Sequence, residues 1–268
     1  MKKLAIICLL LFSVFSSAES AFEVLPLNSP VKESTANFLI KFNQNLEIEE
    51  VAYQIKNAGK IFEKPTNFQK VILSNGPEGK VLKVNVSKLT PGFYQLFVKI
   101  KDKKRNEHFF KTKYKDHAMF VIDSSLEVPM PDPKKNNATI AGIDSDNDGI
   151  RDDVQRWINE EFGDQPRVKM AMRQLAISRQ NELLSVQNKK ASILFVRKML
   201  DDLTCLDYVV GTSVGEKLAR EMKSMFLNTK DRIYAEIKAN ANFSGQSWNL
   251  PNDINEERAM CNFDLNKL

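Results

Sequence analysis

Histidine, cysteine and tryptophan are scarce in this chain of 268 residues, which has two, three and two of them. The two histidines, His108 and His117, stand in neither an H-x-x-x-H nor an H-E-x-x-H pattern, so the common zinc motifs are missing. No Cys-x-x-Cys and no glycine-rich phosphate loop is present. These absences weigh against catalysis, but a carboxylate-based active site would leave little trace in one sequence, and the question of an enzyme stays open.

Long apolar runs are also missing after the first residues, which read "MKKLAIICLLLFSVFSSAES". Lys2 and Lys3 precede an apolar run that ends at Phe15, the length of a signal-peptide core and too short to span a bilayer. We predict a signal peptide over residues 1–18, cleaved after Ala18, with an uncleaved anchor as the alternative. The mature chain is expected to be exported, periplasmic or secreted, with no transmembrane segment.

Cleavage would remove Cys8 and leave Cys205 and Cys261. Exported compartments are oxidising, so these two residues are predicted to form a disulfide. Such a bond would close a loop of roughly 57 residues, a constraint of about 4 kcal/mol in the chain-entropy model. Two buried thiols or a metal pair are the alternatives.

Residues 22–123 carry the alternation of β-strands. In "KVLKVNV", Leu82, Val84 and Val86 fall on one face, and turn signals such as Pro91-Gly92 separate the short apolar runs. "LTPGFYQLFVKIKD", residues 89–102, resembles the strand of immunoglobulin-like and fibronectin-type-III-like modules that carries a tyrosine after a Pro-Gly turn. We therefore expect an N-terminal Ig-like β-sandwich.

Residues 124–139, with three prolines, are predicted to be a linker. Residues 140–268 form the second predicted domain, an α-helical bundle, because the apolar period changes to helical spacing. Helices are expected after Asp152, over 167–184 and 189–209, and as one long helix over about 213–240. The fold class is thus a multidomain α and β protein.

An acidic loop, "DSDNDGIRDD", opens the second half at residues 144–153. Five carboxylates in ten positions repel each other unless a cation lies among them. EF-hand loops place oxygen ligands at positions 1, 3, 5, 7, 9 and 12 and a glycine at position 6. In this register the glycine is Gly149, and the candidate ligands are Asp144, Asp146, Asp148, the Ile150 carbonyl, Asp152 and Gln155. We predict Ca²⁺; Mg²⁺ and a metal-free acidic helix cap are the alternatives.

Two positions depart from the EF-hand pattern: position 12 is Gln155 instead of a bidentate glutamate, and position 8 is Arg151 instead of a hydrophobic residue. The spacing D-x-D-x-D-G-x-x-D resembles thrombospondin type 3 repeats and the EF-hand-like loops of exported bacterial proteins. "GIDSDNDGIRDDVQRWI" in particular looks like a module of unknown role in such proteins, in which the loop leads directly into a helix. The resemblance implies Ca²⁺ ligation by Asp144, Asp146, Asp148, the Ile150 carbonyl and Asp152, and it carries over no activity. Without the bidentate glutamate we expect weak binding, and without a preceding helix or a second loop we expect a structural role for the ion.

A basic stretch lies near the end of the β half. Its functional interpretation is a patch for a polyanion; its simpler interpretation, which we favour, is a hairpin with solvated lysines. The residues of this basic patch are Lys101, Lys103, Lys104, Arg105, Lys111, Lys113 and Lys115.

The sequence therefore predicts an exported, calcium-binding, non-enzymatic binding or structural protein of the cell envelope or secretome. Its partner would be a protein or an envelope glycan. The formal net charge of +5 is too mild to predict nucleic-acid binding. A hydrolase with a carboxylate-based site between the halves, or a periplasmic chaperone or inhibitor, are the alternatives.

Overall fold

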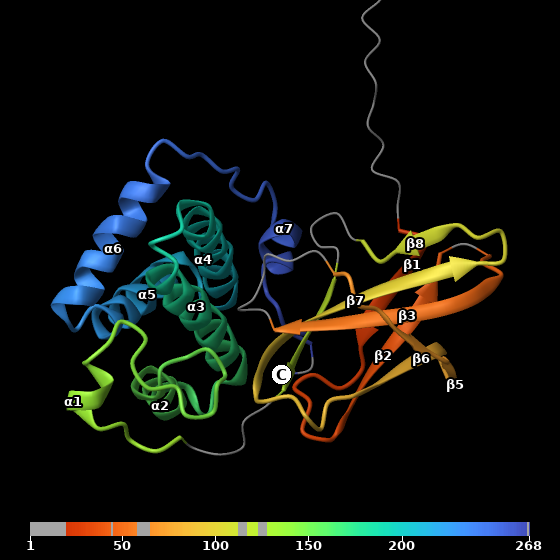
Figure 1. The fold of residues 1–268 in the computed structure, drawn as a ribbon, viewed down its shortest axis with the longest axis horizontal. Helices are drawn as coiled ribbons and strands as arrows, with labels where there is room; N and C mark the ends of the chain where they lie inside the picture. Colours follow the sequence, from red (N-terminus) through yellow and green to blue (C-terminus); the bar gives the residue numbers. More distant parts are fainter. Residues whose placement is uncertain (1–19, 44, 58–64, 112–116, 123–127, 267) are drawn as a thin grey trace, which may run out of the picture.

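A computed structural model describes residues 20–43, 45–57, 65–111, 117–122, 128–266 and 268. Two antiparallel sheets make up the N-terminal half and helices make up the C-terminal half (Figure 1). The predicted signal peptide lies outside the described residues. In the described part of the chain, no helix has the length and apolar character needed to cross a membrane.

The first sheet has the strand order β1-β2-β6-β5, and the second has the order β4-β3-β7-β8, with β9 also paired to β7. All strand pairs within these sheets are antiparallel. The bounds are β1 Phe22–Pro26, β2 Thr35–Phe42, β3 Ile48–Asn57, β4 Gln69–Val71, β5 Ser74–Gly76, β6 Gly79–Asn85, β7 Gly92–Asp102, β8 Glu107–Phe109 and β9 Ala118–Ile122.

The predicted alternation is confirmed on β6, where Leu82 and Val84 are buried and Lys83 is exposed. Side chains from both sheets share one hydrophobic cluster. Phe120 joins the sheets in this cluster, because its ring packs edge-on against Phe38 of β2 at 5.3 Å and stacks on Tyr94 of β7 at 5.5 Å.

The helices of the second half pack around a second cluster. Their bounds are α1 Pro133–Asn136, α2 Asp152–Phe162, α3 Pro166–Leu184, α4 Lys189–Val210, α5 Thr212–Phe226, α6 Lys230–Phe243 and α7 Ile254–Ala259. α1 lies inside the predicted linker, and its residue Asn136 is buried. The division into domains at residues 22–123 and 140–268 stays a prediction.

The expectation of one long helix over 213–240 is wrong. The chain leaves the helix after Phe226 and begins α6 at Lys230. Thr229 is extended and its side chain accepts a hydrogen bond from the backbone N–H of Arg232, as an N-cap does. The Thr229 cap therefore separates α6 from α5, although the apolar spacing continues across the break.

Strand β9 contacts both clusters. Phe120 belongs to the cluster of the sheets, whereas Met119 and Val121 belong to the cluster of the helices. Successive side chains of a strand point to opposite faces, so one strand can serve two cores. The helical half is therefore packed directly against the second sheet.

Cys205 of α4 and Cys261 after α7 lie at disulfide distance, with an S–S length of 2.04 Å. Gln174 of α3 holds the same C-terminal segment: its Nε2 donates to the carbonyl of Met260 at 2.8 Å and its Oε1 accepts from the N–H of Asn262 at 2.7 Å. The C-terminal segment is thus fixed to the helices by one covalent bond and by hydrogen bonds.

The disulfide should stabilise the helical half. Replacing both cysteines, Cys205→Ser with Cys261→Ser, is expected to lower the free energy of unfolding of the helices by about 2–5 kcal/mol, because the closed loop no longer restricts the unfolded chain. Urea titration followed by circular dichroism measures the loss. Reductant should destabilise the parent protein and leave the double variant unchanged. Equal stability of parent and variant would contradict the structural role.

Candidate metal centre

Three of the predicted ligands converge in the acidic loop. One carboxylate oxygen from each of Asp144, Asp146 and Asp152 lies within 4.8 Å of the other two. Asp144 and Asp146 belong to the loop that precedes α2, and Asp152 is the first residue of that helix. Three negative groups this close favour a cation among them, since like charges at this distance disfavour the ionised forms.

Two buried oxygens at this cluster have no hydrogen-bond partner among the described residues. Asp152 is fully buried; its Oδ1 accepts from the N–H of Ser145 at 2.8 Å, and its Oδ2 has no donor. Gln155 is fully buried as well; its Nε2 donates to Asp146 Oδ2 at 3.0 Å, and its Oε1 has no donor. A buried acceptor without a partner is costly. Both oxygens are therefore suited to ligate a metal ion.

The turn of the loop depends on Gly149, which has a φ of +90°. This conformation is strained for residues with a side chain. It directs the N–H of Gly149 to Asp144 Oδ2 at 3.0 Å, while the N–H of Asp148 donates to Asp144 Oδ1 at 3.1 Å. The backbone thus orients the carboxylate of Asp144 within the cluster.

Asp148 does not join the cluster. One oxygen of its carboxylate forms a buried ion pair with Arg173 of α3, and the other accepts from the N–H of Ile150 at 2.7 Å. Ile150, whose carbonyl was the predicted ligand at position 7, buries its side chain in the helical cluster. The Asp148–Arg173 pair thereby attaches the centre of the loop to α3.

Burial changes the protonation of the loop. It raises the pKa of Asp144 to about 6, with a smaller contribution from the charge of Asp146, although N–H donors oppose the shift. It raises the pKa of Asp148 to about 7 despite the opposing charge of Arg173. For Asp144, the fold therefore disfavours the anionic form that a metal ion would bind.

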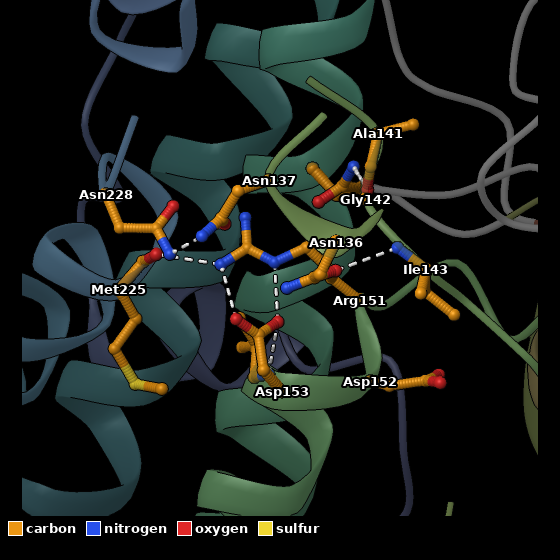
Figure 2. Close-up of polar contacts among 12 residues, drawn as sticks. Asn136, Asn137, Ala141, Gly142, Ile143, Arg151, Asp152, Asp153, Met225 and Asn228 are labelled. Atoms are coloured by element: carbon orange, nitrogen blue, oxygen red, sulfur yellow. Dashed lines mark hydrogen bonds and ion pairs between the residues drawn. The ribbon is translucent and has the colours of Figure 1, made fainter. Parts of the chain in front are cut away.

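Arg151, at position 8 of the loop, attaches it to α5 (Figure 2). Its Nε and Nη2 donate to the carboxylate of Asp153 at 2.5 and 3.0 Å, and its Nη2 also donates to the carbonyl of Met225 at 2.8 Å. Gly142 makes room for this side chain, since a Cβ there would lie 2.2 Å from Arg151 Cδ. An arginine at this position thus replaces the usual hydrophobic contact.

Arg232 of α6 holds the chain that leads into the loop. The side chain is fully buried. Its guanidinium donates to the carbonyls of Asn136, Thr139 and Ile140 at 2.6, 2.9 and 3.2 Å. It also donates to the side-chain oxygens of Asn137 and Asn228. Burial lowers the pKa of Arg232 to about 10, with a contribution from Arg151.

The loop also contacts the β half just before β7. The hydroxyl of Thr90 donates to the carbonyl of Asn147 at 3.5 Å. Gly92, at the start of β7, lies beside the loop; a Cβ there would be in ordinary contact with the carbonyl oxygen of Asp148 at 3.4 Å. The acidic loop of residues 144–153, the candidate metal loop, thus lies between α2, α3 and the second sheet.

The predicted basic patch is partly neutralised by its own sheet. Lys101 and Lys103 form ion pairs with Glu49 and Glu47, both at 3.3 Å. Three further members, Lys104, Arg105 and Lys111, are exposed, and Lys113 and Lys115 lie outside the described residues. These pairs favour the simpler interpretation of a solvated hairpin.

One motif bears on the expectation against catalysis: Gly211 to Gly215 reads G-T-S-V-G, the G-x-S-x-G spacing of nucleophile elbows. That motif requires a strand-to-helix turn. Here Ser213 lies in the first turn of α5, directly after α4. The strand-to-helix turn of such a site is therefore absent here, and both histidines belong to the β half.

Comparison with protein families, with curated proteins and with solved structures found no match for the chain. The interpretation of the site therefore depends on its geometry.

The role of Arg232 can be tested by Arg232→Met, which keeps the length of the side chain and removes its donors. We expect the free energy of unfolding of the helical half to fall by about 3 kcal/mol or more, because several carbonyls lose their buried donor. Chemical denaturation measures this change. Arg220→Met removes an exposed arginine paired with Glu216 and serves as the control, with little expected effect. Equal effects of the two substitutions would contradict the anchoring role.

The raised carboxyl pKa values predict a pH dependence in chelator. A folded-state pKa above the unfolded value of about 4 means that the native state binds more protons between about pH 4 and 7. Stability in chelator should therefore fall as the pH rises through this window. Thermal unfolding at about pH 5 and pH 8 measures it, and Asp148→Asn should reduce the slope. A stability that rises with pH throughout would contradict the assignment.

Proposed function

We propose that the chain is a calcium-binding protein whose ion is held by Asp144, Asp146, Asp152 and Gln155. The observation that carries this proposal is the convergence of three carboxylates, one of which (Asp152) has a buried oxygen without a donor, beside the equally donor-less Oε1 of Gln155. Ca²⁺ takes six to eight oxygen ligands in flexible geometry, whereas Mg²⁺ demands an octahedron and keeps its waters. The Ile150 carbonyl, at position 7 of the pattern, is a further ligand by analogy with EF-hand loops.

The role of the ion in this proposal is structural. Asp148 uses its carboxylate to hold the loop on Arg173, Arg151 holds it on α5, and Thr90 contacts it from the β half. An ion in the centre would offset the repulsion that these attachments leave in place. The loop then belongs, as its spacing suggests, with EF-hand-like and thrombospondin-type-3-like calcium loops.

For the N-terminal half we propose an Ig-like β-sandwich packed beside a helical bundle. Two observations support the sandwich. The strand orders β1-β2-β6-β5 and β3-β7-β9 correspond to the A-B-E-D and C-F-G sheets of such domains. The hydroxyl of Tyr94 donates to the carbonyl of Thr90 at 2.7 Å, as in a tyrosine corner.

We further propose that the protein is exported and that it has a non-enzymatic binding or structural role in the cell envelope or secretome. The apolar N-terminal stretch and the cysteine pair at disulfide distance support export. An extracellular medium rich in calcium would fill even a weak site of the class with dissociation constants of about 10⁻⁴–10⁻³ M.

The proposal is tested by thermal unfolding with Ca²⁺, with Mg²⁺ and with chelator. A ligand that binds only the folded state adds RT ln(1 + [L]/Kd), so millimolar Ca²⁺ should stabilise the protein by about 1 kcal/mol or more. Asp146→Asn with Asp152→Asn should abolish the shift, because two of the three carboxylates are lost.

Asp164→Asn removes an exposed carboxylate outside the cluster and should keep the full shift. If Ca²⁺ shifts neither the parent nor the Asp164→Asn protein, the calcium assignment is wrong. A larger shift with Mg²⁺ than with Ca²⁺ would instead reassign the metal.

A further inference from the structure

A cavity of about 700 Å³ lies between the metal loop and the β half. The end of β3, the segment before β7, the metal loop and α3 all contribute to its walls. Its volume falls in the range of small-molecule sites, about 300–1,000 Å³. Sites of this kind occur where two packed units meet, as they do here.

The cavity reaches the metal cluster, because Asp144 lines the cavity and also belongs to the cluster. The EF-hand pattern obtains two oxygens from a bidentate glutamate at position 12, whereas Gln155 offers one amide oxygen. Three carboxylates, this amide and one carbonyl leave a Ca²⁺ ion short of its six to eight ligands if each binds through one oxygen. An external oxygen ligand entering from the cavity can occupy the remaining positions.

The other walls favour a ligand that combines negative charge with a ring. Lys56 and Lys88 come from the β half, and Asn181 of α3 adds an amide. Ile55 and Leu89, both half-buried, supply apolar surface. Such a mixture of a few polar groups and apolar walls is typical of sites that orient a small molecule.

We propose that this cavity is a calcium-dependent site for a carboxylated saccharide, such as a uronate. The inference rests on the proposed calcium function. A uronate carries a carboxylate beside ring and hydroxyl oxygens, so one rigid unit can fill two neighbouring positions on the ion. A flexible acidic peptide would lose more conformational entropy for the same contacts. Lys88 then contacts the remaining carboxylate oxygen or the next unit of the saccharide.

The test is calorimetric titration of the full purified protein with a galacturonate trimer, corrected for the heat of mixing sugar and Ca²⁺. Binding is expected in Ca²⁺ and not in chelator, and the neutral galactose trimer should not bind. Lys88→Ala should weaken binding of the uronate roughly tenfold, the effect of losing one charge-assisted contact. The affinity for Ca²⁺, titrated separately, should be unchanged in this variant.

Lys83→Ala is the matched control, since Lys83 is exposed on β6 and does not line the cavity. Normal Ca²⁺ binding without uronate binding would overturn this inference and leave the calcium function intact. Absence of Ca²⁺ binding would overturn both. Uronate binding that survives in chelator, that is equally weakened by Lys83→Ala, or that an aspartate-rich peptide matches, would also overturn the inference.

Discussion

Repulsion among Asp144, Asp146 and Asp152 is the constraint on which the loop and its surroundings depend. The chain brings these carboxylates within 4.8 Å of one another and buries Asp152 completely. Backbone N–H groups donate to Asp144, which orients its carboxylate but supplies no full positive charge. The geometry is maintained by the protein, and a cation among the three carboxylates would offset their repulsion.

The five aspartates of the loop fall into two groups. Asp148 and Asp153 each have an arginine partner, Arg173 and Arg151, and these ion pairs attach the loop to the helices. The three cluster carboxylates have, among the described residues, only N–H donors of the loop and the amide of Gln155. An acidic run in the sequence thus separates in space into attachment points and a candidate metal centre.

The spacing of residues along the chain was sufficient to predict several features. The alternation of Leu82 and Val84 predicted a strand. The D-x-D-x-D-G-x-x-D spacing predicted one site for its four aspartates, and all of them except Asp148 come together. Contacts over long sequence separations could not be predicted. The pairing of Asp148 with Arg173 and the burial of Arg232 depend on how helices pack. The break before α6 depends on one N-cap, which apolar periodicity does not reveal.

The position of the loop links the two halves. β9 buries Phe120 among the strands and Met119 and Val121 among the helices, so the halves cannot separate without exposing apolar surface. At the edge of this contact, Thr90 bonds to the loop through its hydroxyl and to Tyr94 through its carbonyl. An ion that orders the loop therefore also orders the segment that leads into β7. Calcium bound in the helical half would in this way also order part of the β half, through a few side chains and through the shared strand β9.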